Sequence, residues 1–381
     1  MRITGIDSVV LTAPTGGLDW IGGRADTWDT ALVRIATDEG LYGLGEVSQG
    51  ASGAGAVAGI AACLAPIAVG MDPERPAAVR HALYNRSLFW ARGGISQGVI
   101  SAIENACWDI AGKARGIPVY QLLGGPARDQ IRVYASIGLG ATPEFILKDV
   151  VKAQAAGYDL LKVRSFKNVH RTIELLEDVK RVLKPGTRIL FDAIMGIAPE
   201  PWTFKEAVAV GRKLEMMDAV LFEEPCRTED IDGYVELRKR LDIPVAGVET
   251  YNSRFDFQRL IDAGGVDVVQ PDATIVGGIT ELLAVAAYAQ SRFIKVVPHT
   301  WGSSVTRMAN YQAALSCPWC ELVEHSPYDN PLVDALLTDG PLKIANGRFT
   351  APTAPGLGVR INDDVIQKYA HYSPGKGIHA S

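Results

Sequence analysis

Cysteine is scarce in this chain, with five residues among 381. A set that is so small and odd in number excludes a disulfide framework of the kind that holds small secreted domains together. Cys317 and Cys320 form a Cys-x-x-Cys pair, but the sequence has no second pair and only His325 lies nearby. We therefore interpret the pair as core packing rather than as a metal or redox site.

The chain also lacks an excess of positive charge and any long apolar run. Its 38 basic and 43 acidic residues give a formal net charge of −5, which leaves no basic stripe for nucleic-acid binding. No stretch is long and apolar enough to cross a bilayer, and no cationic start leads into an apolar segment. We expect a cytoplasmic protein that binds neither nucleic acid nor membrane.

The first third of the chain predicts an antiparallel meander followed by helices. Branched and apolar residues at 3–11, 31–36 and 41–44 indicate three strands, with a hairpin turn at 38–40. From 54 to 125 the apolar residues recur at the three- and four-residue spacing of buried helix faces.

Two segments read as irregular. The glycine-rich stretch 15–27 carries Trp20 and Arg24, and we interpret it as a mobile loop whose large side chains cover a site. After residue 342 the composition becomes loop-like, which indicates an extended tail that returns to the first domain.

The middle of the chain changes rhythm, because short apolar runs alternate with turns and helical patterns. An open doubly wound sheet is the alternative to a barrel, but no Gly-x-Gly-x-x-Gly follows any of these runs. Parallel strands that alternate with helices close into a (β/α)8 barrel when there are eight of them. The eight predicted strands are 131–137, 160–163, 188–191, 219–222, 244–248, 266–269, 293–297 and 321–323.

Ionisable residues stand where seven of these strands end. The carboxyl ends of barrel strands meet at one rim, where such folds place their active sites. Helix capping explains a single acidic residue at a strand end, but it does not explain seven in succession. The residues are Lys162 with Arg164, Asp192, Glu223 with Glu224, Glu249, Asp272, His299 and Glu324.

Three of these carboxylates predict a metal site. Asp192, Glu223 and Glu249 come from adjacent strands, and without compensation they would repel one another and raise each other's pKa. Ligation by oxygen alone favours Mg²⁺, with Mn²⁺ as a second possibility.

The remaining residues predict acid–base chemistry. Lys162 and Arg164 lie two apart on a strand and therefore point the same way. His299 is expected to face them, and an Asp272 carboxylate on the neighbouring strand would fix its tautomer and raise its basicity.

These residues resemble the enolase superfamily and, within it, the mandelate racemase / muconate lactonizing enzyme family, over nearly the whole chain. The resemblance implies a modified TIM-like barrel at 126–342, and an α+β capping domain formed by 1–125 and completed by a tail at 343–381. It also implies a homo-oligomer, a dimer or an octamer. The motifs that carry it are the segment AIENACWDIAGK at 102–113, LLGG at 122–125, Glu223-Glu224-Pro225, Pro271-Asp272 with Gly277-Gly278, and Pro298-His299.

The resemblance also implies the chemistry. A small-molecule carboxylate is bound to Mg²⁺, and its α-proton is removed to give an enediolate. By position, Asp192, Glu223 and Glu249 match the metal ligands, His299 with Asp272 matches the base dyad, and Glu324 matches an acid that donates a hydrogen bond to the enolate.

Two positions depart from the family pattern. Arg164 stands where the family usually has a second lysine, and a guanidinium is a carboxylate clamp rather than a base. Unless Lys162 reaches across, only one face of the substrate has a base, which favours β-elimination over racemisation. Ile194 stands where an asparagine is frequent, so a polar contact near the metal is expected to be missing.

We therefore predict a hydro-lyase: a sugar-acid dehydratase. A sugar-lactone cycloisomerase or a racemase/epimerase remains the alternative, and a non-catalytic binding homologue is the third. Substrate specificity is assigned to Trp20, Arg24, Tyr251 and Trp301.

Overall fold

The computed structural model of the chain describes residues 1–20, 23–48, 50–140 and 142–370. Within these residues the strands form a three-stranded sheet in the order β1-β2-β3 and a ten-stranded sheet that contains β4 to β13. The strands are β1 (Ile3–Trp20), β2 (Gly23–Thr37), β3 (Tyr42–Val47), β4 (Gln130–Ser136), β5 (Leu160–Arg164), β6 (Arg188–Asp192), β7 (Phe222–Glu223), β8 (Val245–Gly247), β9 (Val268–Val269), β10 (Lys295–Val296), β11 (Leu322–His325), β12 (Ile344–Ala345) and β13 (Arg348–Thr350).

Many of the described helices begin where the sequence supplies a capping side chain. Thr142, Asn168, Thr203, Asp230, Ser253 and Ser303 each accept a hydrogen bond from the first turn of a barrel helix. The helices are α1 (Gly50–Ala68), α2 (Pro76–Arg86), α3 (Gly94–Arg115), α4 (Val119–Leu122), α5 (Pro143–Ala155), α6 (Val169–Val182), α7 (Phe204–Glu215), α8 (Ile231–Arg240), α9 (Arg254–Ala263), α10 (Ile279–Ser291), α11 (Ser304–Ser316), α12 (Pro331–Ala335) and α13 (Asp363–Tyr369).

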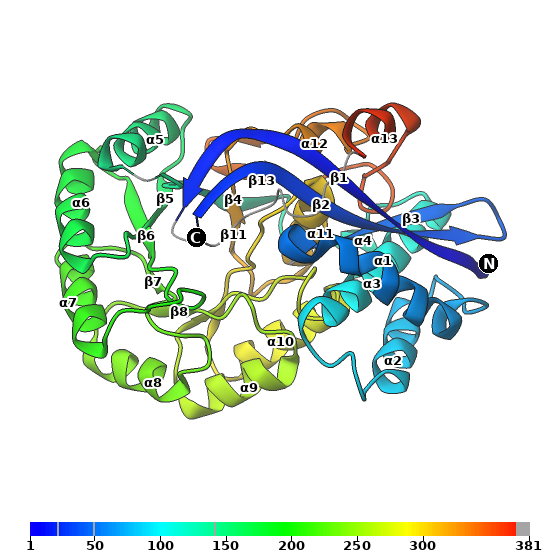
Figure 1. Cartoon of the computed structure of the whole chain (residues 1–381), viewed down its shortest axis with the longest axis horizontal. Helices are drawn as coiled ribbons and strands as arrows, with labels where there is room; N and C mark the ends of the chain where they lie inside the picture. The colour runs from blue at the N-terminus through cyan, green and yellow to red at the C-terminus, as the bar shows by residue number, and fades with distance from the viewer. Residues whose placement is uncertain (21–22, 49, 141, 371–381) are drawn as a thin grey trace.

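The eight predicted barrel strands are confirmed as β4 to β11. Parallel pairing runs without interruption from β4 to β10, and β11 pairs in parallel with β4. The ring closes where the amide of Glu324 donates to the carbonyl of Pro298 at 3.4 Å. Figure 1 shows helices α5 to α9 as an outer arc around these strands. All ends of the parallel strands that carry the ionisable residues therefore meet at one rim.

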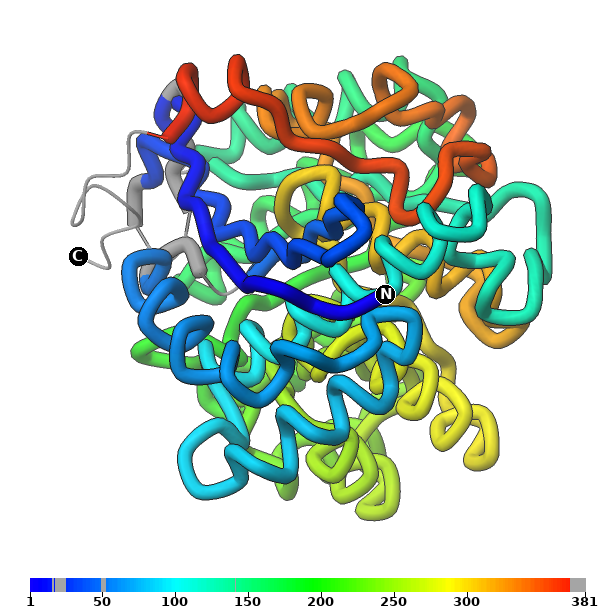
Figure 2. The backbone as a smooth tube through the Cα atoms, turned by 90° about the vertical axis from the view of Figure 1, so that its right-hand side faces the viewer, coloured from blue at the N-terminus to red at the C-terminus, as the bar shows by residue number. Residues whose placement is uncertain are grey.

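The N-terminal sheet lies directly on helix α3. A Cβ atom at Gly45 would lie 1.9 Å from the carbonyl oxygen of Ala102, and one at Gly43 would lie 2.1 Å from that of Ala106. Alternate residues of β3 thus meet successive turns of α3, and only glycine permits the approach. In Figure 2 helices α1, α2 and α3 are grouped against these N-terminal strands.

The expected loop at 15–27 is wrong. Strand β1 continues to Trp20 and β2 begins at Gly23, so that the two strands stay paired along a long hairpin. Within the segment expected to be a loop, the register shift lies between Pro14 and Leu18, and a second shift lies between Ile3 and Gly5 at the start of β1. Main-chain pairing with the opposite strand therefore outweighs the conformational freedom of the glycines.

The C-terminal part contacts both the barrel and the N-terminal sheet. Strand β13 pairs with β4, and the following segment reaches helix α3, where the Asp109 carboxylate accepts hydrogen bonds from the amides of Leu44 at 3.0 Å and Leu357 at 2.8 Å. The buried carboxylate of Asp109, on α3, thereby connects this helix to β3 and to the C-terminal segment.

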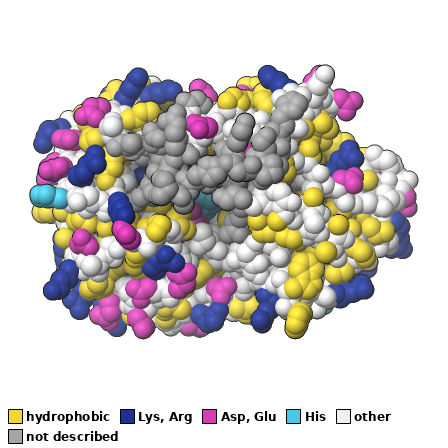
Figure 3. All heavy atoms as spheres, viewed as in Figure 1, with side chains coloured by type: hydrophobic (Ala, Val, Ile, Leu, Met, Phe, Trp, Pro, Cys, Tyr) yellow, Lys and Arg dark blue, Asp and Glu magenta, His cyan; other side chains and the backbone are white. Residues whose placement is uncertain are grey.

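Among the described helices none is long and apolar enough to span a bilayer. In Figure 3 acidic and basic side chains are interspersed over the half of the molecule that carries the barrel helices.

Candidate active site

Strand register places the charged residues of β5, β6 and β7 side by side. Arg164 pairs with Asp192 across β5 and β6, and Asp192 pairs with Glu223 across β6 and β7. Residues that are paired across parallel strands point to the same face of the sheet. These side chains therefore converge on the interior of the rim.

The ammonium group of Lys162 lies among three of the carboxylates. Its Nζ is 2.6 Å from Oε1 of Glu223, 2.8 Å from Oε1 of Glu324 and 3.6 Å from Oδ2 of Asp192. Burial alone would lower the pKa of Lys162, but Glu223 and Glu324 hold that pKa well above its usual range. Lys162 is therefore a fixed cation here and a poor base.

The backbone at this rim adopts an unusual conformation. Ile194, Glu224 and Val248 have φ angles of 57°, 44° and 67°, values that β-branched residues such as Ile and Val rarely adopt. Each lies within two residues of a predicted metal ligand, which is Asp192 on β6, Glu223 on β7 or Glu249 just after β8. Such strain is retained where the surrounding structure fixes a functional geometry.

His299 and Asp272 form the predicted pair. Nδ1 of His299 lies 2.8 Å from Oδ2 of Asp272, while Oδ1 of Asp272 accepts hydrogen bonds from Asn310 at 2.9 Å and from the amide and hydroxyl of Thr274, both at 2.7 Å. With four donors around it the carboxylate is fixed in orientation, and its contact with Nδ1 favours the imidazole tautomer that carries its proton on Nδ1. Nε2 is then the nitrogen that can accept a proton.

Nε2 of His299 faces two acids. It lies 3.5 Å from Glu249 and 3.7 Å from Glu324. Burial alone would lower the pKa of His299, but Glu249, Glu324 and Asp272 raise it to about 10. The imidazole therefore takes up a proton readily, and any added positive charge beside Glu249 would lower this pKa again.

Glu324 connects the two sides of the site. Its Oε1 meets Lys162 as described above, and its Oε2 accepts from the amide of Thr300 at 2.9 Å. Burial favours the protonated acid, but the charges of Lys162, His299 and Arg164 hold the pKa of Glu324 well below its usual range. This arrangement favours the carboxylate form of Glu324, and the hydrogen-bond donation to an enolate that the family resemblance implies stays a prediction.

Arg164 is held by its neighbours. Its two terminal nitrogens donate to the carbonyl of Ile137 and the hydroxyl of Ser136, both at 2.9 Å, and its guanidinium lies 5.1 Å from the centre of the Trp301 ring. Nε remains 3.6 Å from Asp192. The residue can orient a carboxylate but cannot act as a base.

The charge balance of the site suits a divalent cation. Burial and the neighbouring carboxylates raise the pKa of Glu223 to about 8, although Lys162 opposes the shift, and burial likewise raises the pKa of Glu249. Oε2 of Glu223 is buried without a hydrogen-bond partner. Among the described residues no three acidic, histidine or cysteine side chains are already arranged as a closed ligand group. The excess of buried oxygen donors nevertheless fits a hard cation.

The predicted substrate-binding residues lie in different surroundings. Trp301 lies at the active-site rim beside Arg164. The centre of its ring is 5.7 Å from that of Trp28 and 6.5 Å from that of Tyr328. Tyr251 instead packs edge-on against Phe257, and its hydroxyl donates to the carbonyl of Thr228 at 3.1 Å. The side chains of Trp20 and Arg24 lie outside the described part of the structure.

Two supporting residues carried no signal in the sequence. Asn310, inside helix α11, is revealed only by its contact with Asp272. Glu46, at the end of β3, is buried and accepts hydrogen bonds from the amides of Ser303 and Thr306 at 3.2 and 3.1 Å and from the Ser303 hydroxyl at 2.6 Å. It thereby joins the capping sheet to the start of α11, next to the segment that carries His299.

Two family models match the chain. The model described as enolase C-terminal domain-like matches residues 146–365. The model of the mandelate racemase / muconate lactonizing enzyme N-terminal domain matches residues 23–124. Together they include the barrel from α5 onward, the helices α1 to α4 of the capping region and all the predicted metal-binding and acid–base residues.

Named relatives share the whole architecture. D-galactarolactone cycloisomerase of Agrobacterium fabrum is 30% identical over 92% of this chain and 94% of its own. Arabinonate dehydratase of Saccharolobus solfataricus is 32% identical over 90% of both chains. The crystal structure of the 3,6-anhydro-D-galactonate cycloisomerase of Zobellia galactanivorans superimposes with a TM-score of 0.87 at 29% identity, and the match covers 97% of this chain and 99% of that one.

Proposed function

The chain belongs to the mandelate racemase / muconate lactonizing enzyme family of the enolase superfamily, and on this basis we propose that it is a Mg²⁺-dependent sugar-acid dehydratase. Members of the superfamily generally use Mg²⁺, and relatives of this chain are named sugar-acid dehydratases. The proposed substrate is a small acid with one hydroxyl group on the acidic α-carbon and a second on the neighbouring β-carbon.

One observation carries the choice of dehydration. Among the described residues the site offers one histidine base, His299 with its Asp272 partner, whereas Arg164 and an ion-paired Lys162 lie on the strand across the rim. Racemisation requires a base on each face of the carbon, but β-elimination requires only one. A single histidine can remove the α-proton and then return it to the departing hydroxyl.

The chemistry divides between the cation and the side chains. Asp192, Glu223 and Glu249 would hold Mg²⁺, which when bound stabilises negative charge on the substrate carboxylate. Nε2 of His299 takes the α-proton, and Asp272 stabilises the imidazolium that results. The electron pair of the broken C–H bond forms the new double bond as the β-hydroxyl departs with a proton from His299, and the enol that remains tautomerises to a 2-keto acid.

Arg164 and Trp301 are proposed to position the substrate. The guanidinium keeps its plane through the contacts with Ser136 and Ile137, and this plane suits the two oxygens of a carboxylate. The tryptophan ring covers it and limits access of water. We further propose Trp20 and Arg24 on the hairpin, and Tyr251 beyond β8, as contributors to specificity.

The product distinguishes dehydration from racemisation or epimerisation, which form no keto group. The Mg²⁺-loaded protein is incubated with aldonic and aldaric acids, and semicarbazide then detects any 2-keto acid. A semicarbazone that forms with wild type but not with His299→Asn supports the dehydratase. Conversion without a keto product, seen by NMR, would contradict it.

A lactone cycloisomerase is the second candidate, because one relative is named D-galactarolactone cycloisomerase and the Zobellia structure is also named a cycloisomerase, of 3,6-anhydro-D-galactonate. A cycloisomerase would use the same His299 to remove the α-proton of the substrate. The group that leaves the β-carbon of the substrate would then be the ring oxygen of the lactone instead of a free hydroxyl. The experiment that distinguishes the two presents the lactone and the open acid of the same sugar. Turnover of the lactone alone would favour the cycloisomerase.

A further inference from the structure

A large cavity lies at the end of the barrel opposite the active site. Its volume is about 980 Å³, and it is lined by the first residues of several barrel strands, including Leu160, Arg188, Lys295 and Leu322. Active-site residues occupy the other ends of the same strands. The cavity is therefore separate from the site described above, and its size is that of a small-molecule site.

The floor of this cavity is apolar. Leu160, Leu221, Val268 and Val297 line it, and they belong to the cluster of side chains that fills the barrel interior. A ligand on this floor would bury apolar surface against a preformed wall. This favours an occupant with a hydrophobic body.

The edge of this cavity, at the end of the barrel away from the active site, is rich in basic residues, although the whole chain carries a net charge of −5. Six basic and three acidic side chains line the described cavity. The four arginines that line the cavity each form an ion pair with an acid: Arg132 with Asp159, Arg188 with Asp218, Arg238 with Asp267 and Arg292 with Asp262.

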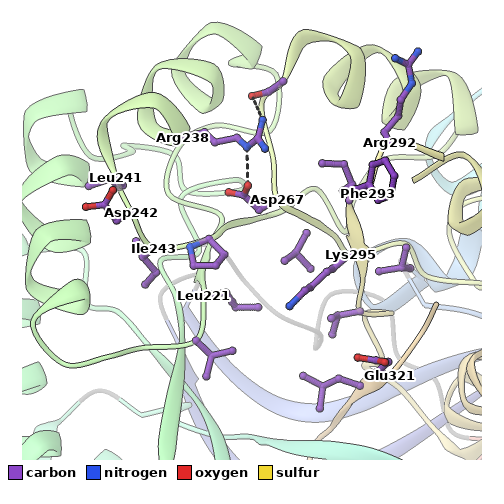
Figure 4. A pocket seen from close by; sticks show the side chains of 18 of the residues that line it. Leu221, Arg238, Leu241, Asp242, Ile243, Asp267, Arg292, Phe293, Lys295 and Glu321 are labelled. Atoms are coloured by element: carbon purple, nitrogen blue, oxygen red, sulfur yellow. Dashed lines mark hydrogen bonds and ion pairs between the residues drawn. The ribbon is translucent and has the colours of Figure 1, made fainter. Parts of the chain in front are cut away.

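Lys295 differs from these arginines. No ion pair and no hydrogen bond of its side chain is found among the described residues, and Figure 4 shows it extending into the cavity while Arg292 points away. The nearby acids Asp267 and Glu321 also line the cavity, but neither pairs with it. An anionic ligand would supply the missing partner.

Phe293 also lines this cavity, and both its exposure and its backbone conformation are unusual. Its side chain is 86% exposed, and its φ angle is 59°. An aromatic residue in this left-handed conformation costs stability, and glycine is the usual choice after a helix such as α10. An exposed, strained aromatic beside an apolar floor and a free lysine has the features of a ligand contact.

We propose that this cavity binds a small amphipathic carboxylate, with the apolar body on the floor and under Phe293 and the carboxylate on Lys295. The occupant is distinct from the sugar acid of the active site, because a polyhydroxylated acid would leave the apolar floor unsatisfied. Binding at this end of the barrel is independent of the function proposed above.

Fluorescence titration tests the site. The probe is 8-anilinonaphthalene-1-sulfonate, whose aromatic body and single negative charge match the cavity, and decanoate is the competing carboxylate. We expect saturable binding at one site, displacement by decanoate, and affinity reduced at least ten-fold in Lys295→Gln. The matched control Lys205→Gln removes an exposed lysine on α7, away from the cavity, and it should bind as wild type does.

Phe293→Gly separates a ligand contact from a purely structural residue. The glycine relieves the strained backbone, so the urea midpoint should rise while probe affinity falls at least five-fold. Wild-type affinity in either Lys295→Gln or Phe293→Gly would overturn the proposal, as would a probe that decanoate does not displace. His299→Asn should bind the probe normally, so that this test and that of the proposed function fail independently.

Discussion

The side-chain amide of Asn310 donates a hydrogen bond of 2.9 Å to Oδ1 of Asp272, the oxygen that His299 does not use. The amide of Ala273 donates in turn to the side-chain oxygen of Asn310 at 2.9 Å. Asn310 thus fixes both the carboxylate and the backbone of the loop after β9. The orientation of the proposed base therefore depends on a helix that does not touch the substrate.

Replacing Asn310 by alanine tests this dependence. We expect kcat to fall about ten-fold with little change in KM, because partners that orient a catalytic group affect its geometry rather than substrate binding. Steady-state kinetics with the active sugar acid measures the effect. Ser316→Ala, at the other end of the same helix, is the control. A change in KM alone would indicate that Asn310 has no positioning role.

The strained backbone at Ile194 predicts a stabilising substitution. Asparagine tolerates a φ of 57° better than isoleucine does. We therefore expect Ile194→Asn to raise the free energy of unfolding by about 1 kcal/mol, measured by urea denaturation of the metal-free protein. Ile194→Val keeps the branched Cβ and should show no such gain. An equal gain in both variants would mean that side-chain packing, and not strain, governs this position.

Mg²⁺ binding should release protons at neutral pH. His299 has a pKa raised to about 10 and Glu223 one raised to about 8, so both carry protons at pH 7 in the metal-free protein. A cation among the carboxylates lowers both pKa values. Mg²⁺ affinity should therefore increase from pH 6 to pH 8.

Calorimetry in two buffers with different ionisation enthalpies measures this release directly. The apparent binding heat should differ between the buffers, and the difference should shrink in His299→Asn, which lacks one of the titrating groups but keeps the three proposed ligands. Identical heats in both buffers would contradict the proposed link between the metal and these two side chains.

Glu104 makes the contact between the capping helices and the barrel sensitive to pH. It accepts hydrogen bonds from Trp108 at 2.8 Å and from Thr280, while burial raises its pKa from 4.5 to about 7. The folded state therefore holds a proton that the unfolded chain releases above pH 4.5. This contribution to stability is complete below pH 4.5 and is lost as the pH rises through 7.

Glu104→Gln is neutral at every pH and serves as the reference. From pH 4.5 to pH 8 the free energy of unfolding of wild type should fall relative to the variant by about 2–3 kcal/mol, the equivalent of a shift of this size. Urea denaturation at several pH values gives both curves. Parallel curves would show that Glu104 does not titrate in this range.

The barrel and the rim were predictable because their signals are local. Each strand is a short apolar run, and each ends at a polar residue, so the rule that strand ends meet brings Asp192, Glu223, His299 and their neighbours together. The sequence could not show how their charges balance. That Glu324 lies between Lys162 and His299, and is thereby held as a carboxylate, depends on distances across the barrel.

The errors arose where tertiary pairing overrides local preference. The glycines of 15–27 favour a loop, yet main-chain pairing between β1 and β2 extends through most of the segment. The roles of Asn310 and Glu46 could not be predicted from the sequence. The function of a buried polar residue inside a helix or strand depends on the hydrogen bonds that it forms with the element packed against it.

Deuterium exchange with His299→Asn tests the central claim most directly. The protein is incubated in D₂O with Mg²⁺ and the sugar acids that it converts, and NMR follows the α-position of substrate and product. If His299 is the base, exchange and turnover fall by at least a hundred-fold in the variant, while Mg²⁺ binding is retained. Exchange that persists in the variant would contradict the account and move the base to Lys162.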